Sequence, residues 1–323
     1  MNPREIKARV LLHRRISADL FRLRLLCPEV ARLASPGQFV MLRVHALQEP
    51  FLRRPFSFSR IFPARKPRKT PLAEGGVEIC YRVVGRGTSL LAQTAEGQRL
   101  DILGPLGNGF WREEGRDRCI LVGGGIGIAP LIAWAEELGG AAAGKKRARR
   151  EGAKDVLFIM GGKSRDQIVG LPEARKMGFE AEVSTEDGSL GARGMATDLL
   201  ERELLEGHTA STALYACGPP AMLARVAQMA DQFDLPCQVL LESRMACGVG
   251  ACLGCTVKLR EEAGASGRGE TRNGAEEAPS ETAGECGAGP REERMPVISA
   301  APFRYARACK EGPVFDARKI IWD

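Results

Sequence analysis

The stretch Cys119-Ile-Leu-Val-Gly-Gly-Gly-Ile-Gly-Ile-Ala-Pro130 decides the fold of the middle of the chain. Its apolar start predicts a buried strand, its glycine run a tight turn, and the residues up to Leu138 a helix. Pro130 fits the first turn of that helix, where a missing N–H costs nothing. Glycines before a helix let a pyrophosphate approach the backbone amides. The predicted nucleotide-binding residues are Gly123, Gly124, Gly125 and Gly127. Because the run does not match G-x-G-x-x-G, a tight turn without a ligand is the alternative.

Downstream, buried strands alternate with helices, which predicts a doubly wound parallel sheet over residues 113–240. Further strands are expected at 156–160, 180–184 and 213–216. The last of them runs into Cys217-Gly218-Pro219, at the strand end where open α/β sheets bind ligands. Cys217 is therefore a candidate contact for a nicotinamide ring, and a small buried residue is the alternative. Residues 139–152 are expected to form a solvated insert.

Upstream, short apolar runs separated by turn residues predict an antiparallel β-barrel over residues 1–112. The expected strands are 5–12, 20–26, 38–44, 77–84 and 99–103. The basic stretch 63–71, which contains prolines, is expected to be a hairpin loop.

Two motifs in this barrel region suit a flavin. In Arg53-Arg54-Pro55-Phe56-Ser57, an arginine can fork onto a pyrophosphate, and the Ser57 hydroxyl can hydrogen-bond the isoalloxazine near N5. In the stretch from Tyr81 to Thr88, Gly87 and Thr88 can offer donors to phosphate. Each motif alone also fits an ordinary strand turn or hairpin. Together, upstream of a nucleotide fold, they predict a flavin site.

Composition excludes several classes of protein. Hydrophobic and charged fractions of 44% and 27% are globular values, which excludes a disordered or collagen-like chain. No run approaches the about 18 apolar residues of a membrane span, and the N-terminus lacks the layout of a secretory signal, so we expect a cytoplasmic protein. The net charge of +7 permits an anionic ligand, but with 6% aromatic residues no nucleic-acid partner is indicated. Ten cysteines in such a chain indicate metal or redox chemistry rather than disulfides.

The cysteines Cys247, Cys252 and Cys255 have the C-x4-C-x2-C spacing of plant-type [2Fe–2S] ferredoxins, which need a fourth, distant thiolate. Glycines between them let the loop wrap around a small anionic cluster. Cys286 and Cys309 are the two candidates for the fourth ligand. Cys309 is preferred because Cys286 lies in the Glu-, Gly- and Ala-rich tract 261–294, which is expected to be a disordered insert. A structural zinc site is the alternative, although the x4 arm fits it poorly.

The order of these motifs resembles that of the ferredoxin–NADP reductase superfamily. The segment from Glu242 to Cys255, with Val314-Phe-Asp-Ala after Cys309, resembles more specifically the electron-transfer subunits of NAD-dependent dihydroorotate dehydrogenases. The resemblance implies an FAD-binding barrel, an NAD-binding domain and a C-terminal [2Fe–2S] lobe over residues 241–323. It assigns the cluster to Cys247, Cys252, Cys255 and Cys309. It assigns FAD to Arg54, Pro55, Phe56, Ser57, Tyr81, Arg82, Val83, Gly87 and Thr88.

The resemblance also implies a partner, an FMN-containing catalytic subunit in a heterotetramer with two copies of each chain. Electrons from dihydroorotate would then reach NAD⁺ through the cluster and FAD, in pyrimidine biosynthesis. Ser57 and Cys217 are the expected catalytic contacts, to flavin and nicotinamide. There are two alternatives to this interpretation. One is a ferredoxin–NAD(P) reductase-like or sulfide dehydrogenase subunit, in which Lys163-Ser164-Arg165 would meet a 2′-phosphate. The other is a non-enzymatic, zinc-bearing interaction module.

Overall fold

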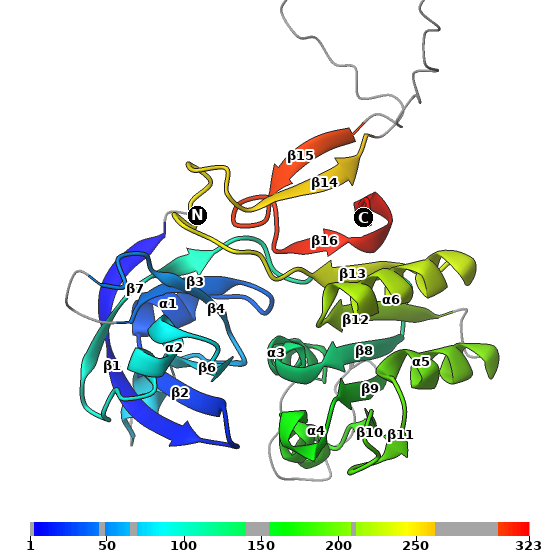
Figure 1. Ribbon diagram of the computed structural model, residues 1–323, viewed down its shortest axis with the longest axis horizontal. Coiled ribbons are helices and arrows are strands. Elements are labelled where there is room, and N and C mark those ends of the chain that lie inside the picture. Colours follow the sequence, from blue (N-terminus) through cyan, green and yellow to red (C-terminus); the bar gives the residue numbers. More distant parts are fainter. Residues whose placement is uncertain are drawn as a thin grey trace, which may run out of the picture.

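The computed structural model describes residues 3–44, 49–64, 70–139, 155–207, 211–261 and 303–322. Most of the two expected inserts, the tip of the 63–71 loop and Cys286 lie outside these ranges. Figure 1 shows an antiparallel sheet on the left, an α/β layer structure on the right and a two-stranded hairpin above them. Within the described ranges, no helix has the length and apolarity needed to cross a bilayer.

The first sheet has the order β4-β3-β7-β1-β2-β6-β5 in the described residues, and every pairing in it is antiparallel. It curves so that its edge strand β4 contacts β6, which confirms the predicted barrel. Its strands are β1 (Arg4–Arg15), β2 (Leu20–Leu26), β3 (Phe39–Arg43), β4 (Arg54–Ser57), β5 (Arg60–Phe62), β6 (Gly76–Arg82) and β7 (Arg99–Leu106). The short helices α1 (Pro28–Leu33) and α2 (Arg86–Leu91) and a 3₁₀ turn (Pro71–Glu74) connect them.

Strand alternation gives β6 two chemically different faces. Ile79 and Tyr81 point into the barrel, where they are at most 2% exposed among other apolar side chains. Glu78, Cys80 and Arg82 point the other way, toward the second half of the molecule. This outward face of β6 becomes the contact between the two halves.

The second sheet has the order β11-β10-β9-β8-β12-β13-β16 in the described residues. The strands are β8 (Arg118–Gly124), β9 (Asp155–Gly162), β10 (Glu180–Thr185), β11 (Ala192–Arg193), β12 (Thr212–Cys217), β13 (Cys237–Leu240) and β16 (Val314–Asp316). Helices α3 (Ile128–Gly139) and α4 (Leu171–Met177) cover the face nearer the barrel, and α5 (Ala196–Leu205) and α6 (Pro220–Gln232) cover the other (Figure 1). Short 3₁₀ turns occupy Gly125–Gly127, Arg165–Gln167 and Ala317–Lys319.

The sheet differs from the expected all-parallel arrangement at one edge. β8 to β13 pair in parallel, but β16 joins β13 antiparallel, with Val239 opposite Phe315. β16 comes from the segment predicted to belong to the C-terminal lobe. Val314 and Phe315 are buried, and pairing on this edge places both in apolar cores. The C-terminal segment is thus divided between this sheet and the hairpin β14 (Thr256–Arg260) and β15 (Phe303–Arg307).

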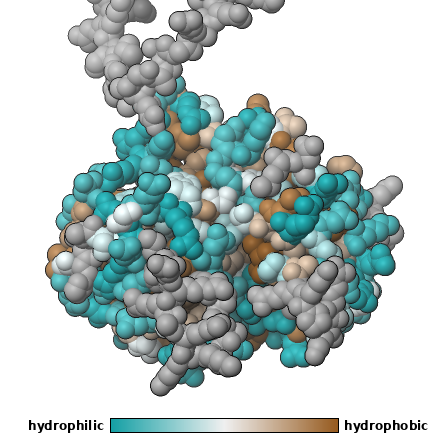
Figure 2. All heavy atoms as spheres, turned by 180° about the vertical axis from the view of Figure 1, so that it is seen from behind, coloured by the Kyte–Doolittle hydropathy of each residue, from teal (hydrophilic) through white to brown (hydrophobic). Residues whose placement is uncertain are grey.

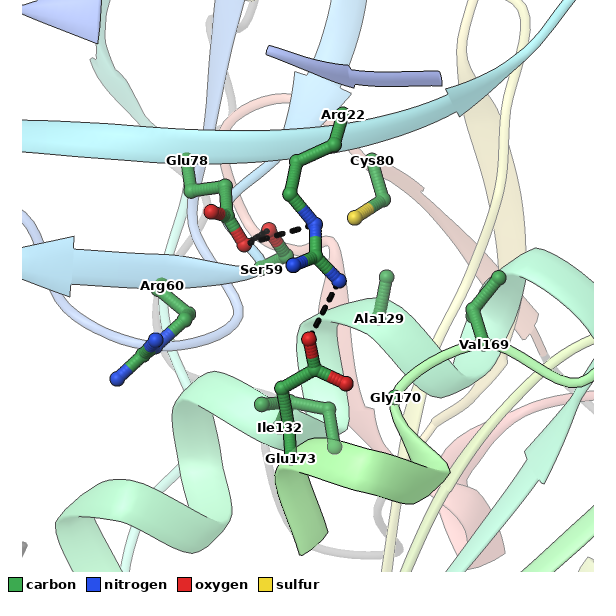
Figure 3. A pocket seen from close by; sticks show the side chains of 10 residues that line it. All are labelled: Arg22, Ser59, Arg60, Glu78, Cys80, Ala129, Ile132, Val169, Gly170 and Glu173. Carbon is green, nitrogen blue, oxygen red and sulfur yellow. Dashed lines mark hydrogen bonds and ion pairs between the residues drawn. The ribbon is translucent and has the colours of Figure 1, made fainter. Parts of the chain in front are cut away.

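Arginine–glutamate pairs hold the barrel against the second domain (Figure 3). The Arg22 guanidinium on β2 lies between Glu78 of β6, at 3.6 Å, and Glu173 of α4, at 2.5 Å. Glu78 is 1% exposed and also accepts a 2.6 Å hydrogen bond from Arg24. Arg60 on β5 donates to Glu136 on α3 at 2.7 Å. Seen from behind, the surface is mainly hydrophilic, with hydrophobic residues in small areas (Figure 2).

Candidate functional site

The four predicted ligand cysteines lie together. Cys252 hydrogen-bonds Cys247, and Cys309 hydrogen-bonds Cys255. Burial, the bond to Cys255 and the nearby Cys255 and Cys247 thiols raise the pKa of Cys309 to about 12. Burial acts to raise the pKa of Cys247 as well, but hydrogen bonds from the Val249 and Cys252 amides and from the Cys252 thiol lower it to about 6. The four thiols therefore form two hydrogen-bonded pairs that lie close to each other.

The β14–β15 hairpin explains how Cys309 reaches the other three. β14 begins directly after Cys255, and β15 ends two residues before Cys309. Their antiparallel register sets Thr256 opposite Arg307, and the Ala308 amide donates to the Cys255 carbonyl at 2.8 Å. The long segment between the strands leaves from the opposite end of the hairpin. Its length therefore does not separate the two cysteines.

The loop that carries the first three cysteines needs unusual backbone angles. Gly248 and Gly250 have φ of +72° and +84°, a region that favours glycine. Leu253 adopts φ of +57° and is 61% exposed. This coiling turns amides inward, and the Val249 N–H lies 3.4 Å from the Cys247 sulfur. A loop of this shape suits a small anionic cluster.

No group of three or more His, Cys, Asp or Glu side chains in the described part of the chain already surrounds a single metal position. Two pairs of thiols match a two-iron centre held by four thiolates better than one tetrahedral zinc. The donor set, the inward amides and the glycine turns therefore fit a [2Fe–2S] cluster.

The two flavin motifs meet across the barrel surface. A Cβ built on Gly87 would lie 3.0 Å from Nε of Arg54, so the arginine lies directly on this glycine in the first turn of α2. Arg53 is committed elsewhere, since it pairs with Asp101 at 2.7 Å and with Glu5 at 2.5 Å. The Arg54 guanidinium donates only to backbone carbonyls of its own turn among the hydrogen bonds of the described residues. Arg54 therefore retains a charge that a phosphate can neutralise.

The other predicted flavin contacts divide by face. Pro55, Phe56 and Ser57 on β4 are half-buried. The Thr88 hydroxyl is engaged locally, accepting from the Val84 amide at 2.9 Å and donating to the Gly85 carbonyl at 3.0 Å.

Tyr81 points into the barrel, where its hydroxyl lies 2.8 Å from His13 Nε2 and its ring stacks on Phe21. Val83 packs against the same core. Tyr81 can therefore reach a ligand on the outer surface only through its backbone, whereas Arg82 faces outward.

A cleft of about 680 Å³ lies at the carboxyl ends of the parallel strands, next to Arg82. The glycine turn forms its floor. A Cβ on Gly127 would lie 2.3 Å from the Cys217 carbonyl oxygen, and one on Gly124 would lie 2.7 Å from Pro219 Cδ. Gly125 has φ of +56°. Gly124 and Gly127 are therefore required for the floor to close.

Gly218 and Pro219 line this cleft, but the Cys217 side chain lies beneath it. Cys217 is 1% exposed and packs in the core around α3. Burial, followed by the charge of Glu242, raises its pKa well above the ordinary value for a thiol. Cys217 is therefore a neutral, apolar part of the cleft floor.

Arg82 has a buried polar atom that is not paired within the described residues. Its Nε forms an ion pair with Asp19 at 3.0 Å, but its buried Nη2 has no hydrogen-bond partner in the described residues. Nη2 would lie 4.0 Å from a Cβ on Gly125. An anionic or carbonyl group bound over the glycine turn would satisfy it.

Two carboxylates in this cleft, those of Glu186 and Glu242, are not predicted by any sequence motif for coenzyme binding. Glu242 is exposed at the edge of the cleft, but partial burial raises the pKa of its carboxyl, and the charge of Arg82 acts against this rise. Each residue follows a strand directly or within two positions, at the carboxyl edge of the sheet. That position was the available signal, because Glu186 belongs to no motif and Glu242 is only the first residue of the Glu242–Cys255 segment.

The cluster loop touches the barrel next to the flavin motif. A Cβ on Gly248 would lie 2.4 Å from Cγ of Met41 on β3. Met41 is the cross-strand partner of Pro55 on β4, and Phe39 is the partner of Ser57. One strand pair therefore separates the cysteine loop from the Arg54–Ser57 motif.

A curved antiparallel sheet, a glycine-floored cleft and a coiled cysteine loop define an oxidoreductase of the ferredoxin–NADP reductase type with an added iron–sulfur segment. Comparison with solved structures agrees. An NADH-dependent reduced ferredoxin-NADP oxidoreductase is 25% identical with a TM-score of 0.69, covering 98% of this chain and 91% of that one. A ferredoxin NADP⁺ reductase from Neisseria gonorrhoeae shares the fold, with a TM-score of 0.54, 17% identity and coverage of 71% and 91%.

Sequence relatives are more specific. The model of the iron–sulfur cluster binding domain of dihydroorotate dehydrogenase B matches residues 242–268. The dihydroorotate dehydrogenase B (NAD(+)) electron transfer subunit of Desulforamulus reducens is 31% identical over 316 residues, covering 98% of each chain. That of Caldanaerobacter subterraneus subsp. tengcongensis is 32% identical over 318 residues, covering 98% of this chain and 99% of the relative. This chain belongs to the family of dihydroorotate dehydrogenase B (NAD(+)) electron transfer subunits.

Proposed function

We propose that this chain passes electrons from an FMN-containing dihydroorotate dehydrogenase catalytic subunit to NAD⁺, with Ser57 and Cys217 at the reacting rings. Its family makes it an oxidoreductase subunit that uses FAD, a [2Fe–2S] cluster and NAD. The observation that carries the proposal is the contact of Gly248 with Met41, the strand partner of Pro55. This contact sets the cysteine loop against the flavin motif, as electron transfer between them requires.

The cofactors supply the redox chemistry when bound: the cluster exchanges single electrons, whereas FAD exchanges either single electrons or a hydride. The chain's own residues hold and orient them. Cys247 and Cys252 would hold one iron, and Cys255 and Cys309 the other, because the thiols already lie in these two pairs. Inward amides such as that of Val249 would stabilise negative charge on the sulfur atoms.

On the barrel, Arg54 is proposed to neutralise the FAD pyrophosphate, close to the backbone of Gly87 and Thr88. Pro55 and Ser57 would line the isoalloxazine, with the Ser57 hydroxyl at N5, whereas Phe56, which packs on the barrel core beside Tyr81, would contribute through its backbone. Tyr81 and Val83 would contribute through the backbone, because their side chains pack on the barrel core. Arg82 would use its free Nη2 on a cofactor oxygen at the junction with the cleft.

NAD⁺ is proposed to lie across the glycine-floored cleft. Gly124 and Gly125 line the cleft and would leave room for its phosphates over the turn. Gly123 and Gly127 would support the turn from below, since they pack against Ile128 and the Cys217 carbonyl. Gly218 and Pro219 would contact the nicotinamide half, above the buried Cys217.

The family name implies a catalytic partner subunit. Its FMN and a heterotetramer with two copies of each chain belong to the proposal, as does a cytoplasmic location. The nine cysteines in the described ranges form no disulfide with one another, which agrees with a reducing compartment.

The direct test is anaerobic co-purification with the catalytic subunit, followed by dihydroorotate-driven reduction of NAD⁺. We expect the reduction to require this chain, and its spectrum to contain both flavin and iron–sulfur bands. NAD⁺ reduction that proceeds equally well without this chain would overturn the proposal. A colourless preparation that contains zinc would support the interaction-module alternative instead.

A further inference from the structure

Arg307 joins the two parts of the chain that carry the four clustered cysteines. It is the last residue of β15 and lies two positions before Cys309. Its Nη1 donates to the Gly250 carbonyl at 3.0 Å, across 57 positions of sequence. Gly250 lies between Cys247 and Cys252. The guanidinium therefore links the loop that carries one thiol pair to the hairpin end that completes the other pair.

Gly250 faces this hairpin end with both of its backbone groups. Its amide hydrogen-bonds the Cys309 sulfur, while its carbonyl accepts from Arg307. A Cβ on Gly250 would lie 3.0 Å from Cδ of Lys310 and 3.4 Å from Nη1 of Arg307, so the approach is close. A shift of the cysteine loop away from Arg307 would therefore also withdraw an amide from Cys309.

Glu311 fixes the Arg307 guanidinium in this position. Its carboxylate accepts from Nε at 3.1 Å and from Nη2, and it also accepts from the Arg307 amide at 2.7 Å. The Glu311 carbonyl in turn accepts from the Asn108 side chain at 2.9 Å, just after β7 of the barrel. With a carboxylate at Nε and Nη2 and a carbonyl at Nη1, the planar guanidinium has little freedom to turn.

An ordinary surface ion pair is the simplest explanation of Arg307 and Glu311, which are four residues apart and 28% and 33% exposed. Such pairs contribute little to stability. The contact with Gly250 distinguishes this pair from that class. It reaches a distant segment, between two of the cysteines that would hold the cluster.

The pair also brings one positive and one negative charge to the cluster position. The Cys255 and Cys309 thiols lie within electrostatic range of Arg307. A cluster held by four thiolates is anionic, and its reduction adds negative charge, so neighbouring charges shift its potential. Removal of either member of the pair leaves the other uncompensated. The two removals should therefore act on the potential in opposite directions.

We propose that Arg307 is a positioning residue of the iron–sulfur site: it clamps the Gly250 carbonyl to the segment that carries Cys309 and, balanced by Glu311, sets the potential of the cluster. This role rests on the four cysteines being the ligands, as the proposed function assigns them. It adds to them the side chain that holds the loop closed.

The test reconstitutes the cluster anaerobically in the full chain and measures iron per chain, the visible spectrum and the midpoint potential in a titration followed by EPR. Arg307→Gln removes both the charge and the fork of donors, and Arg307→Lys keeps the charge but loses the fork. Glu311→Gln removes only the negative charge. The matched control is Arg304→Gln, an exposed arginine on the same strand, about 10 Å from Arg307 at about 3.3 Å per residue.

We expect Arg307→Gln to retain less iron than the unmodified chain and to lower the potential, whereas Glu311→Gln should raise it. Each should change the equilibrium constant for reduction by about tenfold, which is about 59 mV for one electron. Arg307→Lys should retain less iron but keep a potential close to that of the unmodified chain. Arg304→Gln should change neither quantity.

Potential shifts of the same sign in Arg307→Gln and Glu311→Gln would indicate a loosened loop instead of a balance of charges, and they overturn the proposal. Unchanged iron content and potential in Arg307→Gln overturn it as well. If Arg307→Gln retains no iron while Arg304→Gln does, the clamp is supported, and Glu311→Gln and Arg307→Lys decide the role of the charges. If the unmodified chain takes up no cluster, the assignment of the four cysteines fails, and the proposed function fails with it.

Discussion

Replacement of Gly248 by alanine tests the contact between the cysteine loop and the barrel. The backbone of Gly248 has φ of +72°, which costs a residue with a side chain about 1–2 kcal/mol. The new methyl group would lie 2.4 Å from Met41 Cγ and 2.9 Å from its sulfur, and Met41 is 0% exposed. Overpacking of this kind costs about 1–3 kcal/mol. We expect Gly248→Ala to lower the free energy of unfolding by about 2–5 kcal/mol.

The loop should also move away from β3, so that less iron is retained. The assays are urea unfolding and iron content per chain, compared with Gly254→Ala. Gly254 lies in the same loop, and a Cβ there meets only the Cys252 sulfur, at 3.6 Å. The double variant Met41→Ala/Gly248→Ala removes the clash and should therefore retain more iron than Gly248→Ala. It should not relieve the backbone strain at the positive φ of residue 248. If Gly248→Ala matches the unmodified chain in both stability and iron content, the loop does not rest on the barrel as described.

Three further predictions concern the ligands, the domain contact and pH. Cys309→Ser should lose most of the iron and its visible absorption, whereas Cys286→Ser should keep both; the reverse result would assign the fourth ligand to Cys286. Glu78→Gln should destabilise the chain by about 3–5 kcal/mol in urea unfolding, because Arg22 and Arg24 lose a buried counter-charge; a change below 1 kcal/mol would contradict this.

Because its surroundings raise the pKa of Glu242 above 4.5, its contribution to stability is complete below that pH and is lost as pH rises through the raised pKa. Glu242→Gln should remove this loss in unfolding experiments from about pH 4 to about pH 8, and equal pH profiles for the two chains would refute the shift.

The two flavin motifs show which features of a binding site a sequence pattern predicts and which it does not. Arg53 and Arg54 are equivalent in the pattern, yet the fold ties Arg53 to Asp101 and leaves Arg54 on Gly87. Tyr81 and Arg82 differ because strand residues alternate, and only knowledge of which face is the barrel interior shows that Tyr81 points inward. The residues that give Arg53, Arg54 and Tyr81 their different environments lie far from them along the chain, so the motifs alone do not predict these differences.

The sequence by itself determined the strand–glycine–helix unit at Cys119 to Pro130, the barrel upstream and the three-cysteine loop. Each depends on the periodicity or spacing of residues that are near neighbours in the sequence, and such patterns determine local secondary structure directly. Tertiary structure alone decided that Cys309 stands beside Cys255, that β16 completes the second sheet, and that Glu186 and Glu242 share one cleft. These contacts join segments far apart in sequence, and they are selected by burial of apolar surface over the whole molecule, which no local pattern encodes.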